Sequence, residues 1–196
     1  MKNVKRNREL CADTDDELTA RIIKGDADAF SEIVGRYKDR VYGMAFRVLG
    51  DPDEADECAQ DIFVRIYNTL PSFRAESALS TWIYRVAYNL SLDYARKRKR
   101  KKKREAFSAD DGDCDPSFSD PRSNPESIAL RNEELRQIQS ALLKIDDDQR
   151  ELIILCDIEG KDYDEIRAIT GLAMGTIKSR ISRGRVKLRE LLRGMI

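Results

Sequence analysis

The chain has 196 residues, which is enough for one medium-sized domain or two small ones. Apolar residues make up 41% of it and charged residues 37%, with 10 glycines and 5 prolines, and this composition favours an all-α, strongly solvated protein. No stretch approaches the roughly 18 uninterrupted apolar residues of a membrane span, and the charged start lacks a signal-peptide core. We therefore expect a cytoplasmic protein without direct membrane insertion.

Cysteine and histidine usage argues against a metal site. The chain has no histidine, and no CxxC pair occurs among its four cysteines, which are Cys11, Cys58, Cys114 and Cys156. Zinc sites need such ligands at short, regular spacings. We predict no cofactor and no metal, and we expect reduced thiols, as is usual in the cytosol.

Charge is segregated along the chain, although the formal net charge is +0. Residues 96–104 are nine consecutive basic residues, and residues 174–196 contain seven basic residues against one acid. The rest of the chain is therefore strongly acidic. Local cationic patches on an acidic body can attract phosphate at chosen points, so the charge pattern permits a nucleic-acid-binding protein.

Residues 17–105 are predicted to form a first helical domain, after a flexible N-terminal segment at residues 1–16. Apolar residues recur every three or four positions over residues 29–48, 55–70 and 82–94, as in helices that bury one face. The second of these stripes includes Tyr67 among its buried positions.

The break between the first two helices has a clear local signature. Gly50 interrupts the first stripe, Asp51 is suited to cap the next helix, and Pro52 is suited to its first position. The third helix is predicted to begin near Ser80 and to run into the basic residues.

Residues 106–125 differ in composition, because they contain three of the five prolines and five aspartates with almost no apolar periodicity. We predict a flexible acidic linker here and a second helical domain over residues 126–196. Its first helix should begin near Asn124-Pro125, with one apolar face formed by Ile128, Leu135, Ile138 and Leu142. Residues 146–149 should cap the next helix, which should end at Gly160.

Residues 162–192 are predicted to form a helix-turn-helix unit. Asp162 can cap the first helix, and Gly171 can adopt the left-handed conformation that ends it. The second helix should bury Ile177, Ile181, Leu188 and Leu192. Its other faces would present polar and basic side chains to the major groove of duplex DNA, where Arg can pair with guanine: Thr176, Lys178, Ser179, Arg180, Ser182, Arg183 and Arg185.

Aromatic side chains alternate with cations before the basic run. Aromatic rings can stack on unpaired bases, while a Lys/Arg run neutralises phosphate. The residues concerned are Phe73, Trp82, Tyr84, Tyr88 and Tyr94. Taken singly, each ring, Trp82 included, is better explained by core packing, and the basic run alone could equally be a solvated tail or a targeting-like segment.

Four segments in order resemble bacterial sigma factors of the extracytoplasmic-function (ECF) group: DADAFSEIVGRYKDRVY, EADECAQDIFVRIYNTLPSFR, STWIYRVAYNLSLDYARKR and DYDEIRAITGLAMGTIKSRISRGRVKLRELL. The resemblance covers about residues 17–192 except the linker. It implies a non-enzymatic initiation factor that binds RNA polymerase core and directs promoter-specific transcription. Residues 17–105 would be sigma domain 2, and residues 126–196 would be sigma domain 4.

The resemblance also implies roles for particular residues. The clamp helices of the largest polymerase subunit would bind Asp56, Gln60, Asp61 and Arg65. The minus-10 element would be captured and melted by Phe73, Arg74, Ser80, Trp82, Arg85, Tyr88, Asn89, Arg96, Lys97 and Arg98. The helix-turn-helix would read the minus-35 element, and its domain would contact the flap of the second-largest subunit. Relatives are commonly inhibited by an anti-sigma factor, which we expect as a further partner.

Two alternatives stay open at the level of sequence. A stand-alone helix-turn-helix regulator would need the second domain but not the first domain's polymerase-binding segment. The linker could thread toward the polymerase active-site cleft or act as a plain tether. An enzyme finds little support, because the chain has no histidine, no metal-ligand spacing and no glycine-rich phosphate loop.

Overall fold

The computed structural model describes residues 13–74, 77–105 and 125–193, and all its regular elements in these ranges are helices. The all-α prediction is therefore confirmed. Most of the predicted N-terminal segment and of the predicted linker lies outside the described residues. The first helix begins two residues before the predicted start of the first domain, at Asp15, and the second domain begins with a helix at Pro125.

The N-terminal domain contains four α-helices and a single 3-10 turn. In chain order these are α1 (Asp15–Ile23), α2 (Ala27–Leu49), α3 (Pro52–Thr69), η1 (Leu70–Ser72) and α4 (Leu79–Glu105). Asp51 caps α3 by accepting a hydrogen bond from the backbone N–H of Glu54 at 2.9 Å, and Pro52 is the first helical residue, as predicted. The core between α2, α3 and α4 contains Ile33, Met44, Ile62, Ile66 and Ile83, each at most 1% exposed.

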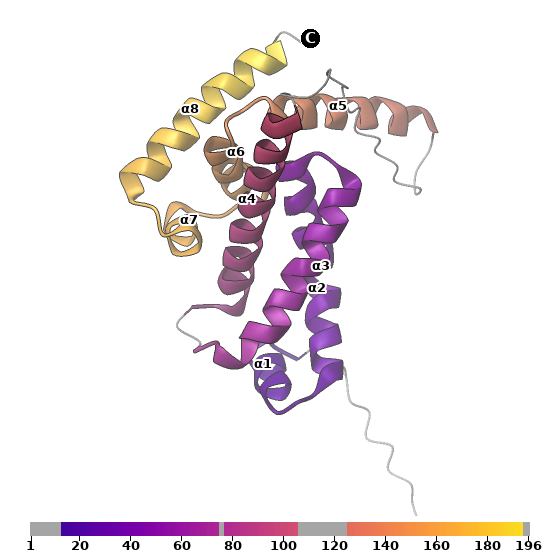
Figure 1. Cartoon of the computed structure of the whole chain (residues 1–196), viewed down its shortest axis with the longest axis vertical. Helices are drawn as coiled ribbons and strands as arrows, with labels where there is room; N and C mark the ends of the chain where they lie inside the picture. Colours follow the sequence, from indigo (N-terminus) through magenta and orange to yellow (C-terminus); the bar gives the residue numbers. More distant parts are fainter. Residues whose placement is uncertain (1–12, 75–76, 106–124, 194–196) are drawn as a thin grey trace, which may run out of the picture.

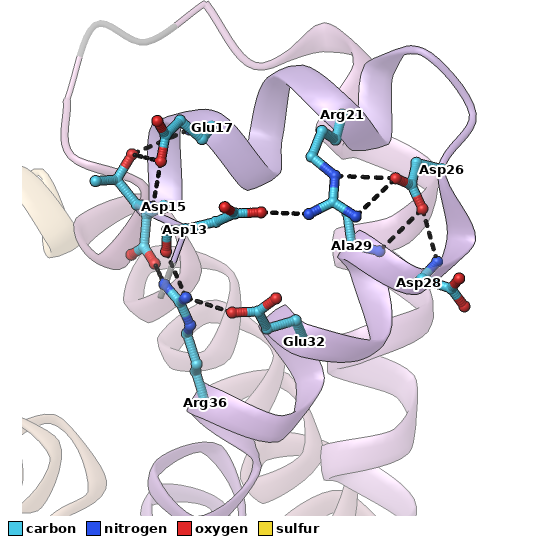
Figure 2. Close-up of polar contacts among 10 residues, drawn as sticks. Asp13, Asp15, Glu17, Arg21, Asp26, Asp28, Ala29, Glu32 and Arg36 are labelled. Atoms are coloured by element: carbon cyan, nitrogen blue, oxygen red, sulfur yellow. Dashed lines mark hydrogen bonds and ion pairs between the residues drawn. The ribbon is translucent and has the colours of Figure 1, made fainter. Parts of the chain in front are cut away.

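Ion pairs attach α1 to α2, as Figure 2 shows. Arg36 of α2 lies 3.0 Å from a carboxylate oxygen of Asp15 and also contacts Glu32. Arg21 of α1 lies 2.9 Å from Asp26, the residue that caps α2. Since α1 also contacts η1, these pairs help to fix the base of the loop that leads to α4.

The C-terminal domain contains α5 (Pro125–Leu143), α6 (Asp147–Ile153), α7 (Tyr163–Thr170) and α8 (Met174–Arg193), with a π-helical turn η2 (Ile154–Ile158) after α6. The helix-turn-helix is formed by α7 and α8. Asp162 and Glu165 make a capping box at the start of α7, and Gly171 ends it with φ of +71°, as predicted.

Two local predictions in this domain differ from the structure. The helix after residues 146–149 does not continue to Gly160 as an α-helix, because η2 replaces its last turn with a wider one. Asp146 occupies the cap position of α6 but makes no capping hydrogen bond with its side chain. Its carboxylate instead accepts a hydrogen bond from the side chain of Gln149 at 3.3 Å.

The two domains pack against each other, with α4 lying between the α2–α3 pair and α6–α8, while α5 contacts α2 (Figure 1). A continuous cluster of buried residues includes side chains from both domains, among them Tyr88 of α4 and Ile166 of α7. Between α5 and α2, the buried amide of Gln139 donates a hydrogen bond to the backbone carbonyl of Phe46 at 2.9 Å. The described arrangement is therefore closed.

Three residues expected on apolar inward faces are exposed instead. Tyr67 of α3 is 54% exposed, and Leu135 and Ile138 of α5 are 42% and 40% exposed. Periodicity predicted helices at these positions correctly, but it placed the edge of each buried face one position too far around the helix. Within the described ranges, no helix is long and apolar enough to cross a membrane.

Candidate polymerase and promoter-binding surfaces

The predicted polymerase-binding residues lie together on the outer face of α3. Their side chains are exposed, and Gln60 donates a hydrogen bond to Asp56 at 2.8 Å. Asp61 accepts a hydrogen bond from the hydroxyl of Tyr94 on α4 at 2.6 Å, while Arg65 is exposed one turn further along. The structure thus brings all four residues onto one accessible surface that can accept and donate charged hydrogen bonds.

Sequence reasoning missed an apolar part of this surface. Val64 is 58% exposed and Tyr67 54% exposed, on the same helix as the polar set. The ring of Tyr67 makes an edge-on contact with Phe30 of α2, with centroids 4.9 Å apart. A polar rim beside exposed apolar side chains is the usual composition of a protein interface.

The residues predicted to capture the minus-10 element surround the start of α4. Phe73 packs against Trp82 with ring centroids 5.3 Å apart, so both rings are half-buried rather than freely presented. Ser80 is half-buried as well, whereas Arg74 and Asn89 are exposed. Asn89 lies further along α4, so the set extends from the start of this helix along its length.

Two members of the predicted minus-10 set lie against the C-terminal domain. Arg85 donates hydrogen bonds to the backbone carbonyl of Ala168 on α7, from Nε at 3.1 Å and from a terminal nitrogen. Tyr88 is buried, at 6% exposed, and its burial raises the pKa of the phenol. In the closed arrangement, Tyr88 is shielded from DNA, whereas Arg85 is exposed but bonded to α7.

The basic run continues α4 as a helix, and its first cations differ in their surroundings. Arg96 is exposed and lies 3.9 Å from Asp93, and Lys97 is exposed 5.4 Å from the centre of the Tyr94 ring. Arg98 is half-buried, where it donates to the backbone carbonyl of Leu49 and pairs with Glu54 at 3.3 Å. Arg98 therefore fastens α4 to the start of α3, a role that the charge pattern could not predict.

The predicted minus-35 residues lie along α8. Ile177 and Ile181 are buried as predicted, whereas Leu188 and Leu192 are only half-buried. Lys178, Ser182, Arg183 and Arg185 are exposed on the other faces. Thr176, Ser179 and Arg180 are half-buried, and Ser179 donates to the backbone carbonyl of Thr176 at 3.0 Å. The helix thus presents a basic, polar surface of the kind that enters a major groove.

The close packing of α8 on α6 depends on Gly184, which sequence reasoning did not single out. A Cβ atom at this position would lie 2.6 Å from Cδ1 of Ile153. The absence of a side chain lets the two helices approach closely. Gly184 therefore fixes the depth at which α8 sits on its domain.

A buried carboxyl lies at the junction of the two domains. Glu151 of α6 is fully buried, and neither of its carboxylate oxygens has a hydrogen-bond partner among the described residues. Burial raises the pKa of Glu151 to about 8, against the smaller opposing effect of the neighbouring Arg150. The charges of Arg96 on α4 and of Asp148 on α6 also act on this carboxyl.

Glu159, which follows η2, connects the C-terminal domain to two helices of the first. Its carboxylate lies 3.2 Å from a guanidinium nitrogen of Arg47 on α2 and accepts a hydrogen bond from the hydroxyl of Tyr84 on α4 at 2.7 Å. The Glu159 side chain is only 10% exposed. Glu159 is therefore a shielded contact between the domains, with one ion pair and one hydrogen bond.

The fold and these surfaces define a two-domain helical protein with a helix-turn-helix suited to duplex DNA. Each of the two domains matches a known protein family. The Sigma-70 region 2 family matches residues 33–101, and the Sigma-70 region 4 family matches residues 135–188.

Relatives match over nearly the whole chain. The ECF RNA polymerase sigma factor SigW of Bacillus subtilis is 37% identical over 89% of this chain and 95% of its own length. The ECF RNA polymerase sigma-E factor of Escherichia coli K12 is 36% identical over 88% of this chain and 91% of its own length.

Solved structures give the same result. CnrH in complex with the cytosolic domain of CnrY has a TM-score of 0.67 and 28% identity, covering 93% of this chain and 99% of that one. The sigma factor RpoE from Bartonella quintana, solved with the anti-sigma factor NepR, has a TM-score of 0.67 and 27% identity, covering 84% and 96%.

The chain belongs to the ECF group of RNA polymerase sigma factors. It is a transcription initiation factor that acts with RNA polymerase core at promoters, and a stand-alone helix-turn-helix regulator is not favoured. The matched ranges place one family region in each structural domain.

Proposed function

We propose that this sigma factor binds polymerase core mainly through the outer face of α3. Asp56, Gln60, Asp61 and Arg65 would bond to the clamp helices of the largest subunit, and the exposed apolar side chains beside them would add buried contact. The proposal is supported by the gathering of all four polar groups on one accessible face. The C-terminal domain would contact the flap of the second-largest subunit.

We also propose that two separate surfaces read the promoter. The region from Phe73 to Asn89 would hold unpaired bases of the minus-10 element, with Arg96 and Lys97 on phosphates. Arg98 would join them only by leaving Leu49 and Glu54. The polar face of α8 would read the duplex minus-35 element. The observation that supports this division is the exposed basic face of α8, which lies above a buried apolar face.

We infer two further properties. An anti-sigma factor would inhibit this protein, since the relative RpoE was solved with the anti-sigma factor NepR. The protein would act without enzymatic activity of its own and in the cytoplasm, where it would meet RNA polymerase.

Reconstituted transcription tests the function as a whole. Purified protein added to sigma-free core polymerase should initiate from a defined set of sites in a genomic promoter library. Initiation at the same sites without the added protein would contradict the proposal, as would binding to core with no specific initiation.

Substitutions test the division of promoter reading. Arg183→Ala should weaken selectivity for the minus-35 sequence, because Arg183 is exposed on α8. Lys97→Ala should weaken binding to all sequences alike and flatten its salt dependence, because a phosphate contact carries no sequence information. Equal effects of the two variants on both measurements would contradict the division.

A further inference from the structure

The cations of α8 fall into two groups in the closed protein. Arg180 lies 3.0 Å from a carboxylate oxygen of Asp148 on α6, and Arg185 donates from Nε to Asp157 of η2 at 3.0 Å and also from a terminal nitrogen. Lys178 and Arg183 are exposed and make no ion pair within the part of the chain that the structure describes. Paired and unpaired cations alternate from Lys178 to Arg185, and Lys187 beyond them lies 3.9 Å from a carboxylate oxygen of Asp146.

The acidic partners come from α6, which packs on α8, and from η2, which follows α6 in the chain. Asp148 lies in the first turn of α6, and Asp157 lies in the wider π-helical turn that follows it. Asp157 accepts two hydrogen bonds from one guanidinium, a geometry that holds the Arg185 side chain in a fixed direction. The hydrogen bond to Asp157 is the main reason that the pKa of Arg185 is raised.

Both pairs are accessible enough to exchange with a phosphate. The side chains of Arg185 and Asp157 are 43% and 34% exposed, and those of Arg180 and Asp148 are 30% and 49% exposed. Ion pairs at such sites contribute little stability, so a well-placed anion can replace the aspartate. A randomly placed phosphate must nevertheless compete with a carboxylate that is already positioned.

We propose that Asp148 and Asp157 are specificity-determining residues for minus-35 recognition, which hold Arg180 and Arg185 away from unselective contacts with phosphate. The two arginines leave their aspartates only on a duplex that offers each of them two acceptor atoms on a base edge in the major groove. The exposed Lys178 and Arg183 contact DNA first, without breaking any ion pair. This inference rests on the proposed function of α8.

Binding measurements on the reconstituted holoenzyme test the inference. The probes are a promoter found by the genomic transcription assay and a duplex of equal length with a scrambled minus-35 element. Asp157→Asn should raise affinity for the scrambled duplex about three- to fivefold and for the promoter less than about twofold. Between about 50 and about 200 mM salt, the plot of log affinity against log salt concentration should become steeper for the scrambled duplex. The increase should correspond to about one additional phosphate contact.

Three further variants make the result specific. Asp164→Asn removes the same charge from an exposed position of α7 that makes no ion pair with an α8 cation among the described residues, and it should leave both affinities near the wild-type values. Asp157→Glu keeps the acceptor and should keep most of the selectivity. Asp148→Asn should change selectivity in the same direction as Asp157→Asn. Because selectivity is a ratio measured on one preparation, an unfolded fraction cancels.

Two outcomes would overturn the inference alone. Equal effects of Asp157→Asn and Asp164→Asn would show that only overall charge matters. A loss of promoter affinity in Asp157→Asn would show that the aspartate merely orients Arg185 for binding. If the wild-type holoenzyme does not distinguish the two duplexes, the proposed reading of the minus-35 element by α8 fails instead.

Discussion

At the scale of single residues, Glu151 is the most unusual group in the protein. A buried carboxyl without a hydrogen-bond partner is costly in its charged form, which is why burial raises the pKa of Glu151 to about 8. In the unfolded chain the same carboxyl titrates near its ordinary value of 4.5. The folded protein therefore binds one more proton than the unfolded chain over the interval between these two values.

This difference predicts how stability depends on pH. The contribution of Glu151 to the free energy of unfolding is fully present below about pH 4.5 and is lost as pH rises toward about 8. Over this interval the free energy of unfolding should fall by at most about 1.4 kcal/mol per pH unit. Glu151→Gln should remove that slope, as urea unfolding from pH 6 to pH 9 can measure. Glu57→Gln, at an exposed position of α3, should retain it. A wild-type slope that persists in Glu151→Gln would contradict the assignment.

Gly50 is a second residue with a specific structural role. It ends α2 with φ of +75°, and a Cβ atom there would lie 2.4 Å from a methyl carbon of Leu143 on α5. Gly50→Ala should lower the free energy of unfolding by about 1–2 kcal/mol. Alanine is strained in the left-handed backbone conformation, and its Cβ atom would clash with Leu143 of α5. Gly35→Ala, at an open position within the same helix, should instead stabilise by about 0.5–1 kcal/mol in the same urea titration.

At the scale of elements, local chemistry explains which predictions succeeded. Asp51-Pro52, Asp162 and Gly171 mark helix ends through contacts within a few residues, so sequence alone located them. The π-helical turn η2, which buries Ile154 and Leu155, follows α6 without any glycine or proline that would have marked it in the sequence. For the binding surfaces, sequence located α8 and α3 and favoured core packing for Tyr88 taken singly, but it did not predict that Arg85 bonds to α7, which depends on contact between distant segments.

The outer face of α3 carries a prediction about assembly with polymerase. Val64→Asp should weaken binding to the clamp-helix region about tenfold or more, because it places a charge at the apolar part of the proposed interface. The free energy of unfolding should change by less than about 0.5 kcal/mol, since Val64 is exposed. Affinity can be measured by fluorescence anisotropy with labelled protein.

A matched substitution separates this effect from a general one. Val186 of α8 is 48% exposed and lies in the other domain. Val186→Asp should leave affinity for the clamp-helix region unchanged. Equal losses in the two variants would argue against α3 as the contact surface.

At the scale of the whole molecule, the closed arrangement hides part of what the promoter would need. Arg85 and Tyr88 face the C-terminal domain, and Glu159 links that domain to α2 and α4. The contact between the domains combines these polar bonds with a continuous cluster of buried apolar side chains, so opening must expose part of that cluster to water. The proposed capture of the minus-10 element requires that α7 move away from Arg85.

Removal of the Glu159 contacts should therefore favour the open form. Glu159→Ala deletes both the ion pair with Arg47 and the acceptor for Tyr84, while it leaves the core of each domain intact. Energy transfer between dyes placed on α3 and α8 should be lower in Glu159→Ala than in the wild-type protein. Once polymerase core is bound, the variant and the wild-type protein should show equal transfer. Glu57→Ala, which alters an exposed residue of α3, should not change the transfer. Unchanged transfer in Glu159→Ala would mean that the apolar contact between α4 and α7 alone keeps the domains together.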